Sequence, residues 1–129
     1  MRQPRLLIYV QHLLGIGHLR RATTLAHGFA AAGLEVTLIS GGFPVPGLDL
    51  SGLGFVQLPP TRAADEHFKA LLDEHDRPVD EAWKARRREL LLAAFDRVRP
   101  DVLLFELFPF GRRQLRFELD PLLEHARAA

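Results

Sequence analysis

The sequence predicts an α/β domain built on a parallel β-sheet. Short, continuous apolar segments alternate along the chain with amphipathic segments, as expected when buried parallel strands are joined by helices. The chain has 129 residues, the length of a single domain. A formal net charge of +1 favours neither nucleic acid nor an anionic membrane as a partner. The sequence contains no cysteine, which excludes disulfides and cysteine-ligated zinc.

Four apolar segments are the expected strands: residues 6–10, 36–39, 55–58 and 101–105. The first follows Arg2 and Arg5, but it is too short to be the apolar core of a signal peptide. No segment reaches the ~20 apolar residues that a membrane span needs. A cytoplasmic location is therefore the default expectation.

Helices are expected between and after these strands. Apolar spacing predicts one from about residue 19 to Gly33, where glycine would close the helix in a left-handed conformation. A second is expected to have Pro78 in its first turn and to stop before Pro100. A third is expected from about residue 112 to 127, interrupted or restarted at Asp120-Pro121.

The order of these elements predicts the topology. Residues 61–77 are mixed in character, and Phe68, Leu71 and Leu72 indicate only a short helix there. The remaining alternation of strands and helices is typical of a Rossmann-like sheet with right-handed crossovers and strand order 3-2-1-4. The sequence stops after a helix, where a further strand would be expected, so we expect a domain that is short or truncated.

Two loops are the expected place of a functional site. In doubly wound sheets, ligands bind beyond the carboxyl ends of the strands, where the strand order reverses. With the order 3-2-1-4, this rule brings residues 11–18 and 106–111 together, because they follow the first and fourth strands. Function should therefore be sought between these two segments.

The first of these loops is rich in glycine. Gly15 and Gly17 permit a tight turn and close approach of a ligand, and the helix that follows offers unpaired N–H groups to an anion. A dinucleotide-binding motif would need glycine where Arg20 stands and an acidic residue where Ser40-Gly41-Gly42 stand. The alternative is that these glycines only form the turn between strand and helix.

His18 and Glu106 are the candidate catalytic residues. His18 lies at the start of the helix, where a neutral imidazole could take a proton from a hydroxyl group. Glu106 directly follows an apolar strand and could orient the histidine from across the crevice. The alternatives are a helix-capping or merely exposed histidine and a solvated acid at the end of a strand.

Two other polar patterns are interpreted as structural. The basic run at residues 84–88 is similar to a phosphate-binding patch, but Glu81 and Glu89 flank it, so we interpret it as the solvated face of a long helix. His12 and His18 are six residues apart, and His67 and His75 are eight apart, so neither pair has metal-ligand spacing. No metal and no cofactor are expected.

Several of these segments resemble a known family. The strand at residues 6–10, the loop Gly15-Ile16-Gly17-His18, and the helix and strand that lead through Gly33 to Gly42 are similar to the opening of GT-B glycosyltransferases. Within that group, the likeness is to predicted glycosyltransferases related to the bacterial transferase that adds N-acetylglucosamine to the peptidoglycan lipid precursor. Residues 79–84 and 106–113 resemble segments of the same predicted subfamily.

The resemblance implies an acceptor-binding N-terminal domain, paired in the full-length enzyme with a second Rossmann-like domain that binds a nucleotide-sugar. In such enzymes, a histidine at the position of His18 acts as general base beside a carboxylate, for which Glu106 is the candidate. That partner is commonly aspartate in the family. Residues expected to contact the substrate are Gly15, Gly17, Arg20, Gly41, Gly42, Phe110, Gly111 and Arg112.

The leading hypothesis is therefore a glycosyltransferase of the hexosyltransferase type, which moves a sugar from a nucleotide-diphospho-sugar to an acceptor hydroxyl. The isolated chain is expected to be inactive, because the donor domain is absent, and to self-associate through exposed apolar surface. A different class of function is a non-catalytic Rossmann-like module that binds a nucleotide or anion, or serves as a subunit of an assembly. Continuation of the reading frame past Ala129 would favour the enzyme.

Overall fold

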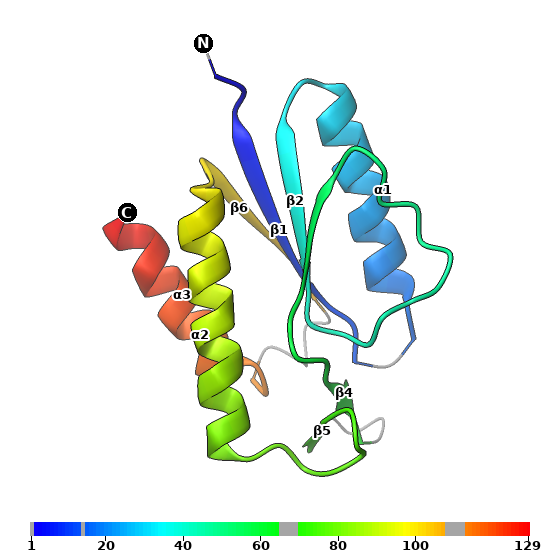
Figure 1. Cartoon of the computed structure of the whole chain (residues 1–129), viewed down its shortest axis with the longest axis vertical. Coiled ribbons are helices and arrows are strands. Elements are labelled where there is room, and N and C mark those ends of the chain that lie inside the picture. Colours follow the sequence, from blue (N-terminus) through cyan, green and yellow to red (C-terminus); the bar gives the residue numbers. More distant parts are fainter. Residues whose placement is uncertain (1, 14, 65–69, 108–112) are drawn as a thin grey trace.

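The computed structural model describes residues 2–13, 15–64, 70–107 and 113–129. Outside the segment between β3 and α2, the helices and strands follow the predicted alternation along the chain (Figure 1). Their bounds are β1 Arg5–Gln11, α1 Gly17–Ala31, β2 Glu35–Ser40, β3 Gly54–Gln57, β4 Arg62–Ala63, β5 Leu71–Leu72, α2 Glu81–Val98, β6 Val102–Leu107 and α3 Arg116–Ala128.

The main sheet has four parallel strands in the order β3-β2-β1-β6. The fourth predicted strand, β6, pairs with β1, so the predicted order 3-2-1-4 is confirmed. In the register of the sheet, Val10 of β1 lies beside Ser40 of β2 and Glu106 of β6. Helix α1 covers one face of the sheet, and α2 and α3 cover the other (Figure 1).

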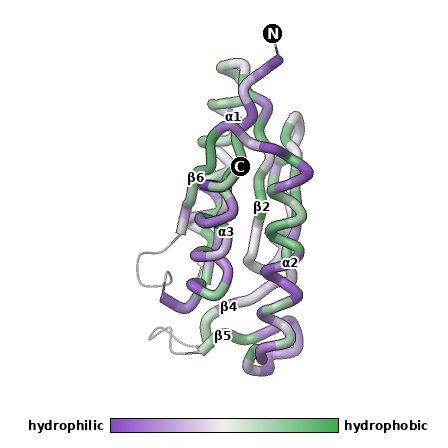
Figure 2. The backbone as a smooth tube through the Cα atoms, turned by 90° about the vertical axis from the view of Figure 1, so that its left-hand side faces the viewer, coloured by the Kyte–Doolittle hydropathy of each residue, from purple (hydrophilic) through white to green (hydrophobic). Residues whose placement is uncertain are grey.

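Strand β1 is buried on both faces, which explains its continuous apolar sequence. Alternate residues enter two separate cores. The core under α1 contains Leu6, Ile8, Val10, Leu19, Ala22, Ala26, Val36 and Leu38. The core under α2 and α3 includes Leu7, Tyr9, Ile39, Leu91, Ala94, Phe95, Leu119 and Leu122. In Figure 2, α2 and α3 alternate between hydrophobic and hydrophilic residues, as expected of helices with one buried side.

Helix α1 ends as predicted at a left-handed glycine. Gly33 has φ +101°, the Leu34 N–H donates to the Phe29 carbonyl, and the Gly33 N–H donates to the Ala30 carbonyl, both at 3.1 Å. These two bonds form a Schellman motif, which satisfies carbonyls at the helix end. The chain then turns directly into β2.

The segment between β3 and α2 differs from the prediction. Leu71 and Leu72 do not form a helix; they form β5, which pairs antiparallel with Arg62 and Ala63 of β4. Phe68 lies outside the described residues. The strand pairing prevails because Leu71 and Leu72 find backbone partners in β4, whereas a helix as short as the predicted one is unstable by itself.

Helix α2 begins later than predicted. Its N-cap is Asp80, whose carboxylate accepts a hydrogen bond from the Trp83 N–H at 2.7 Å, so Pro78 precedes the helix. Aspartate satisfies an N–H group that proline cannot, and it therefore sets the start. The helix stops before Pro100 as predicted, at Arg99, which has φ +52°.

Helix α3 is continuous through Pro121, contrary to the predicted interruption, and it begins at Arg116. Proline removes the N–H that would bond to the carbonyl four residues earlier, that of Phe117. Arg88 of α2 supplies a donor instead, with Nη1 3.3 Å from that carbonyl oxygen. The helix thus keeps its course because a neighbouring helix offers a replacement donor.

Candidate active site

The two predicted loops leave the same edge of the sheet. Helix α1 starts at Gly17, soon after β1 ends, and β6 runs beside β1 with Glu106 next to Val10 (Figure 1). Residues in register on adjacent parallel strands point to the same face, so Glu106 points to the face that α1 covers. His18, in the first turn of α1, therefore lies opposite Glu106.

His18 and Glu106 are in direct contact, as expected from the sequence. The distance from His18 Nδ1 to Glu106 Oε1 is 2.7 Å, and the side chains are 22% and 15% exposed. Arg21, one helical turn further, places Nη1 3.3 Å from the same carboxylate oxygen. A carboxylate beside Nδ1 favours the tautomer with hydrogen on Nδ1, which makes Nε2 the basic nitrogen of the neutral ring.

The structural alternatives for these two residues are not supported. The N-cap of α1 is Ile16, and no side-chain cap is present, so His18 does not cap the helix. Glu106 is mostly buried and paired rather than solvated. The geometry therefore suits a base and its orienting carboxylate, although a catalytic role stays a prediction.

The glycine loop provides the turn between β1 and α1. Gly15 has φ +69°, a conformation that favours glycine, and it is exposed, as are Gly17 and Arg20. A Cβ atom at Gly15 or Gly17 would have no neighbour within 4 Å. Space therefore exists beside the loop, and contact of Gly15, Gly17 and Arg20 with a substrate stays a prediction.

Gly41 and Gly42 are buried, and each has an internal reason to be glycine. A Cβ atom at Gly41 would lie 2.1 Å from Arg87 Nη2, and one at Gly42 would lie 2.2 Å from His12 Cε1. Larger residues would displace these side chains. Substrate contact by the two glycines stays a prediction, as does that by Phe110, Gly111 and Arg112, which lie outside the described residues.

His12 is a second histidine at this edge, which the sequence analysis did not assign to the site. It is 8% exposed, and its Nδ1 is buried with no hydrogen-bond partner among the described residues. Burial lowers the pKa of His12; the Phe43 backbone acts in the opposite direction, and nearby His18 lowers it further. Its position directly after β1 is the only sequence signal that could have indicated it.

The interpretation of residues 84–88 as a solvated face is wrong for Arg87. Arg86 is exposed, but Arg87 is fully buried. Arg87 lies four and eight residues before Leu91 and Phe95, so it occupies the buried side of α2. That spacing could have distinguished it from the other basic residues.

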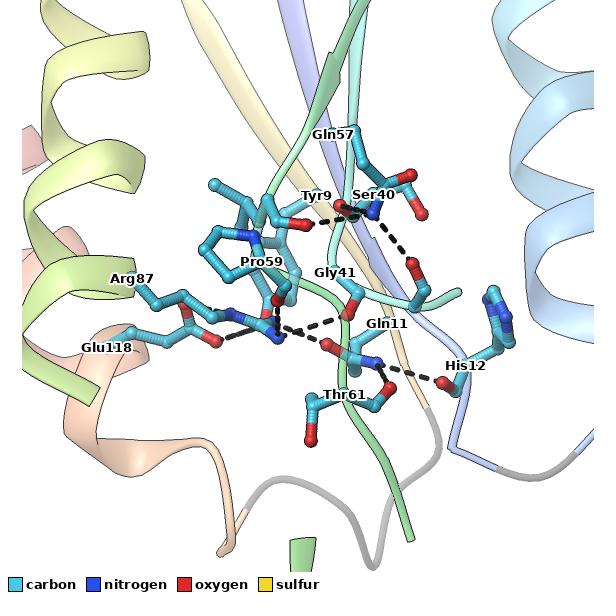
Figure 3. Close-up of polar contacts among 12 residues, drawn as sticks. Tyr9, Gln11, His12, Ser40, Gly41, Gln57, Pro59, Thr61, Arg87 and Glu118 are labelled. Atoms are coloured by element: carbon cyan, nitrogen blue, oxygen red, sulfur yellow. Dashed lines mark hydrogen bonds and ion pairs between the residues drawn. The ribbon is translucent and has the colours of Figure 1, made fainter. Parts of the chain in front are cut away.

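Arg87 is the centre of a buried polar network on the α2 and α3 side of the sheet (Figure 3). Its Nη2 lies 2.8 Å from Glu118 Oε1, and both side chains are 0% exposed. The Tyr9 hydroxyl donates to the same carboxylate oxygen at 2.9 Å. Burial raises the pKa of Tyr9 well above its usual range, and Glu118 acts in the same direction, so Tyr9 stays protonated.

An apolar cavity of about 130 Å³ lies near the start of α1. Its walls come from α1, the ends of β2 and β3, and the segment between them. Lining residues include Leu19, Ser40, Phe43, Val45, Leu48 and Phe55. Leu19 adjoins His18 in sequence, so the cavity and the His18–Glu106 pair lie on the same side of the sheet.

Neither a metal site nor a membrane span was found in the described part of the chain. Within residues 2–13, 15–64, 70–107 and 113–129, no three histidine or acidic side chains gather where they could hold an ion. None of the helices described combines the length and apolarity needed to cross a bilayer.

Comparisons with known proteins identify the fold. No protein-family model matches the chain, and no curated protein matches it. A solved structure of Phytolacca americana UGT2, complexed with UDP-2fluoro-glucose and pterostilbene, matches 99% of this chain with a TM-score of 0.55 and 17% identity. The chain spans 29% of that protein, and nothing in the comparisons points to the peptidoglycan-related transferases. The chain therefore has an α/β fold similar to part of that glycosyltransferase structure, consistent with a Rossmann-like half of a GT-B fold.

Proposed function

We propose that this chain is the acceptor-binding domain of a glycosyltransferase that transfers a sugar from a nucleotide-diphospho-sugar to an acceptor hydroxyl. The observation that carries the proposal is the 2.7 Å contact between His18 Nδ1 and Glu106 Oε1. It joins the first turn of α1 to the carboxyl end of β6, the strand that pairs with β1. In α/β folds the carboxyl edge of the sheet is where ligands bind.

The pair has the chemistry that hydroxyl activation needs. As the acceptor oxygen attacks the anomeric carbon, His18 Nε2 takes the hydroxyl proton and the sugar–phosphate bond breaks, releasing the nucleoside diphosphate. Glu106 holds the ring through Nδ1 and stabilises the positive charge that the ring acquires. A second domain would hold the donor, so the isolated chain should not turn over a nucleotide-sugar.

The proposal assigns the acceptor to the apolar cavity that is lined by Leu19, the residue after His18. Apolar pockets with few polar groups are typical of small-molecule sites. We include three further points in this proposal. The protein is cytoplasmic, it is related to the peptidoglycan-related transferases, and the isolated chain self-associates.

The test is His18→Ala in the full-length protein, with turnover and melting temperature measured on the same preparation. We expect turnover to fall by about 10²–10⁴-fold, because a general base contributes roughly that much, while the melting temperature changes little. His27→Ala is the matched control, since His27 lies on the same helix and its ring bonds to the Asp49 carbonyl. Unchanged turnover in His18→Ala with a lowered melting temperature would return His18 to a structural role.

A further inference from the structure

The side chain of Arg87 connects the carboxyl ends of three strands. Its Nη1 donates to the carbonyl oxygen of Gly41, just after β2, at 3.0 Å and to that of Pro59, just after β3, at 3.1 Å. Its Nη2 donates to Gln11 Oε1 at the end of β1. Figure 3 shows these bonds converging on one guanidinium.

These contacts exceed what the ion pair requires. Two nitrogen atoms of Arg87 contact the Glu118 carboxylate: Nε donates to Oε2 at 3.1 Å, and Nη2 pairs with Oε1. The two hydrogens of Nη1 remain, and both go to backbone carbonyls. Only the planar fork of arginine can hold a carboxylate on one side and two carbonyls on another, because an ammonium is a single point of charge. The residue type is therefore matched to holding the backbone as well as to neutralising Glu118.

The same network fixes the surroundings of His12. The Gln11 side chain, held by Arg87, donates from Nε2 to the His12 carbonyl at 2.8 Å and to the Thr61 carbonyl at 3.2 Å. The His12 ring rests on Gly42, the residue after the Gly41 carbonyl that Arg87 binds. Both the backbone of His12 and the surface beneath its ring are thus tied to Arg87.

We propose that Arg87 is a positioning residue of the candidate site: it fixes the ends of β1, β2 and β3, and with them His12 and the loop that leads to His18. Arg87 acts through Gln11 and Gly41 and touches neither His18 nor Glu106 by any bond described. The importance of this positioning for sugar transfer rests on the proposed function, whereas its test needs no turnover.

Two variants of the chain separate positioning from stability. Gln11→Leu removes the connection to His12 and Thr61 and keeps the Arg87–Glu118 pair. Arg87→Met/Glu118→Leu replaces the buried pair with apolar side chains of similar size, a change that cores often tolerate, but it leaves the two carbonyls without their donor. Arg86→Met is the matched control, because Arg86 is an exposed arginine on the same helix.

The readouts are the His12 ring signals in NMR spectra and the exchange rate of the Thr61 amide, which donates to the Gly41 carbonyl at 3.0 Å. In both variants we expect the His12 signals to move and Thr61 to exchange about tenfold faster, because opening of this segment no longer breaks the bonds to Arg87 or Gln11. Arg86→Met should match the wild type in both measurements.

Unchanged His12 signals and unchanged Thr61 exchange in the two variants would overturn the proposal. Loss of cooperative folding in Gln11→Leu, with Arg86→Met still folded, would also overturn it, because the Gln11 connection would then be structural. In the full-length protein, the double variant should lower turnover at temperatures well below its own melting temperature, where the protein stays folded. If the NMR readouts move but the His18→Ala enzyme keeps its turnover, the proposed function fails and the positioning role stands.

Discussion

Two pairs of a basic side chain and a glutamate lie at the same edge of the sheet, on opposite faces. On the α2 and α3 side, Arg87 and Glu118 are 0% exposed. On the α1 side, the side chains of His18 and Glu106 are 22% and 15% exposed. Each pair contains a glutamate, Glu118 in one and Glu106 in the other, but the pairs differ in burial and in the type of basic side chain, arginine or histidine.

The buried pair is suited to holding structure. Arginine stays protonated at all accessible pH values, and its donors have partners on the backbone as well as on Glu118. The half-buried pair keeps some access to solvent, and under the proposed function its histidine takes the proton of the acceptor. Complete burial with paired donors therefore favours a structural role, whereas partial exposure leaves room for the proposed chemistry.

The largest effect on stability is expected on the buried side. Arg87→Met alone should lower the free energy of unfolding by about 3–5 kcal/mol, because it leaves Glu118 buried without its partner. Arg86→Met should change it by less than about 0.5 kcal/mol, since Arg86 is exposed. Urea unfolding of both variants measures the difference. A loss below about 1 kcal/mol for Arg87→Met would mean that the pair contributes no more than a surface contact.

The half-buried side should respond in turnover rather than in stability. Glu106→Gln in the full-length protein keeps an oxygen that can accept from His18 Nδ1 but removes the charge that stabilises the protonated ring. We therefore expect a smaller loss than for His18→Ala, less than about 10²-fold, with a stability change within about 1 kcal/mol. Paired measurement of kcat and unfolding tests this. A loss equal to that of His18→Ala would assign the carboxylate a larger share of the chemistry than orientation.

Substitution of Gly42 tests how tightly the segment after β2 packs against the His12 ring, which follows β1. An alanine methyl there would lie 2.2 Å from His12 Cε1, so Gly42→Ala must displace the ring and should cost about 1–3 kcal/mol. Gly28 lies inside α1 with open space around it, and Gly28→Ala should instead stabilise by up to about 1 kcal/mol. Thermal unfolding compares them. Equal effects of the two substitutions would show that the His12 ring moves aside freely.

The sequence predicts the sheet well because a strand buried on both faces needs an apolar residue at every position, and this pattern is visible in a short segment. Residues 6–10 are apolar at every position, as a central parallel strand requires, and the strand order follows from the handedness of crossovers. The contact between His18 and Glu106 was also predictable, since it follows from that order and from the positions of the two residues at strand and helix ends.

Other features of the structure, such as the buried network of Arg87, depend on contacts between segments that are distant in the sequence. Arg87 lies in a basic run, and its spacing from Leu91 and Phe95 indicates the buried side of the helix, but its partner Glu118 lies 31 residues later and cannot be identified from that run. The continuity of α3 through Pro121 depends in the same way on Arg88, which belongs to another helix. No local pattern identifies these partners, because the partner that satisfies each group is set by tertiary packing.

The smallest expected effect concerns pH and His12. Burial lowers the pKa of His12 in the folded chain, so the unfolded chain binds its proton first as the pH falls through about 6.5. Unfolding then takes up a proton, and stability declines with falling pH until the folded chain is protonated as well.

His12→Gln removes this contribution, so its melting temperature should fall less than that of the wild type between about pH 7 and 5. The comparison isolates His12, because the two proteins differ at this residue alone. His75→Gln is the control, since His75 is 71% exposed and its substitution leaves the buried His12 ring in place. Parallel curves for wild type and His12→Gln would show that the ring is hydrated in the folded chain. In that case the ends of β1 and β2 would be more open to water than the contact of His12 with Gly42 indicates. The side of the sheet with Arg87 and Glu118 and the side with His18 and Glu106 would then differ less in their access to water.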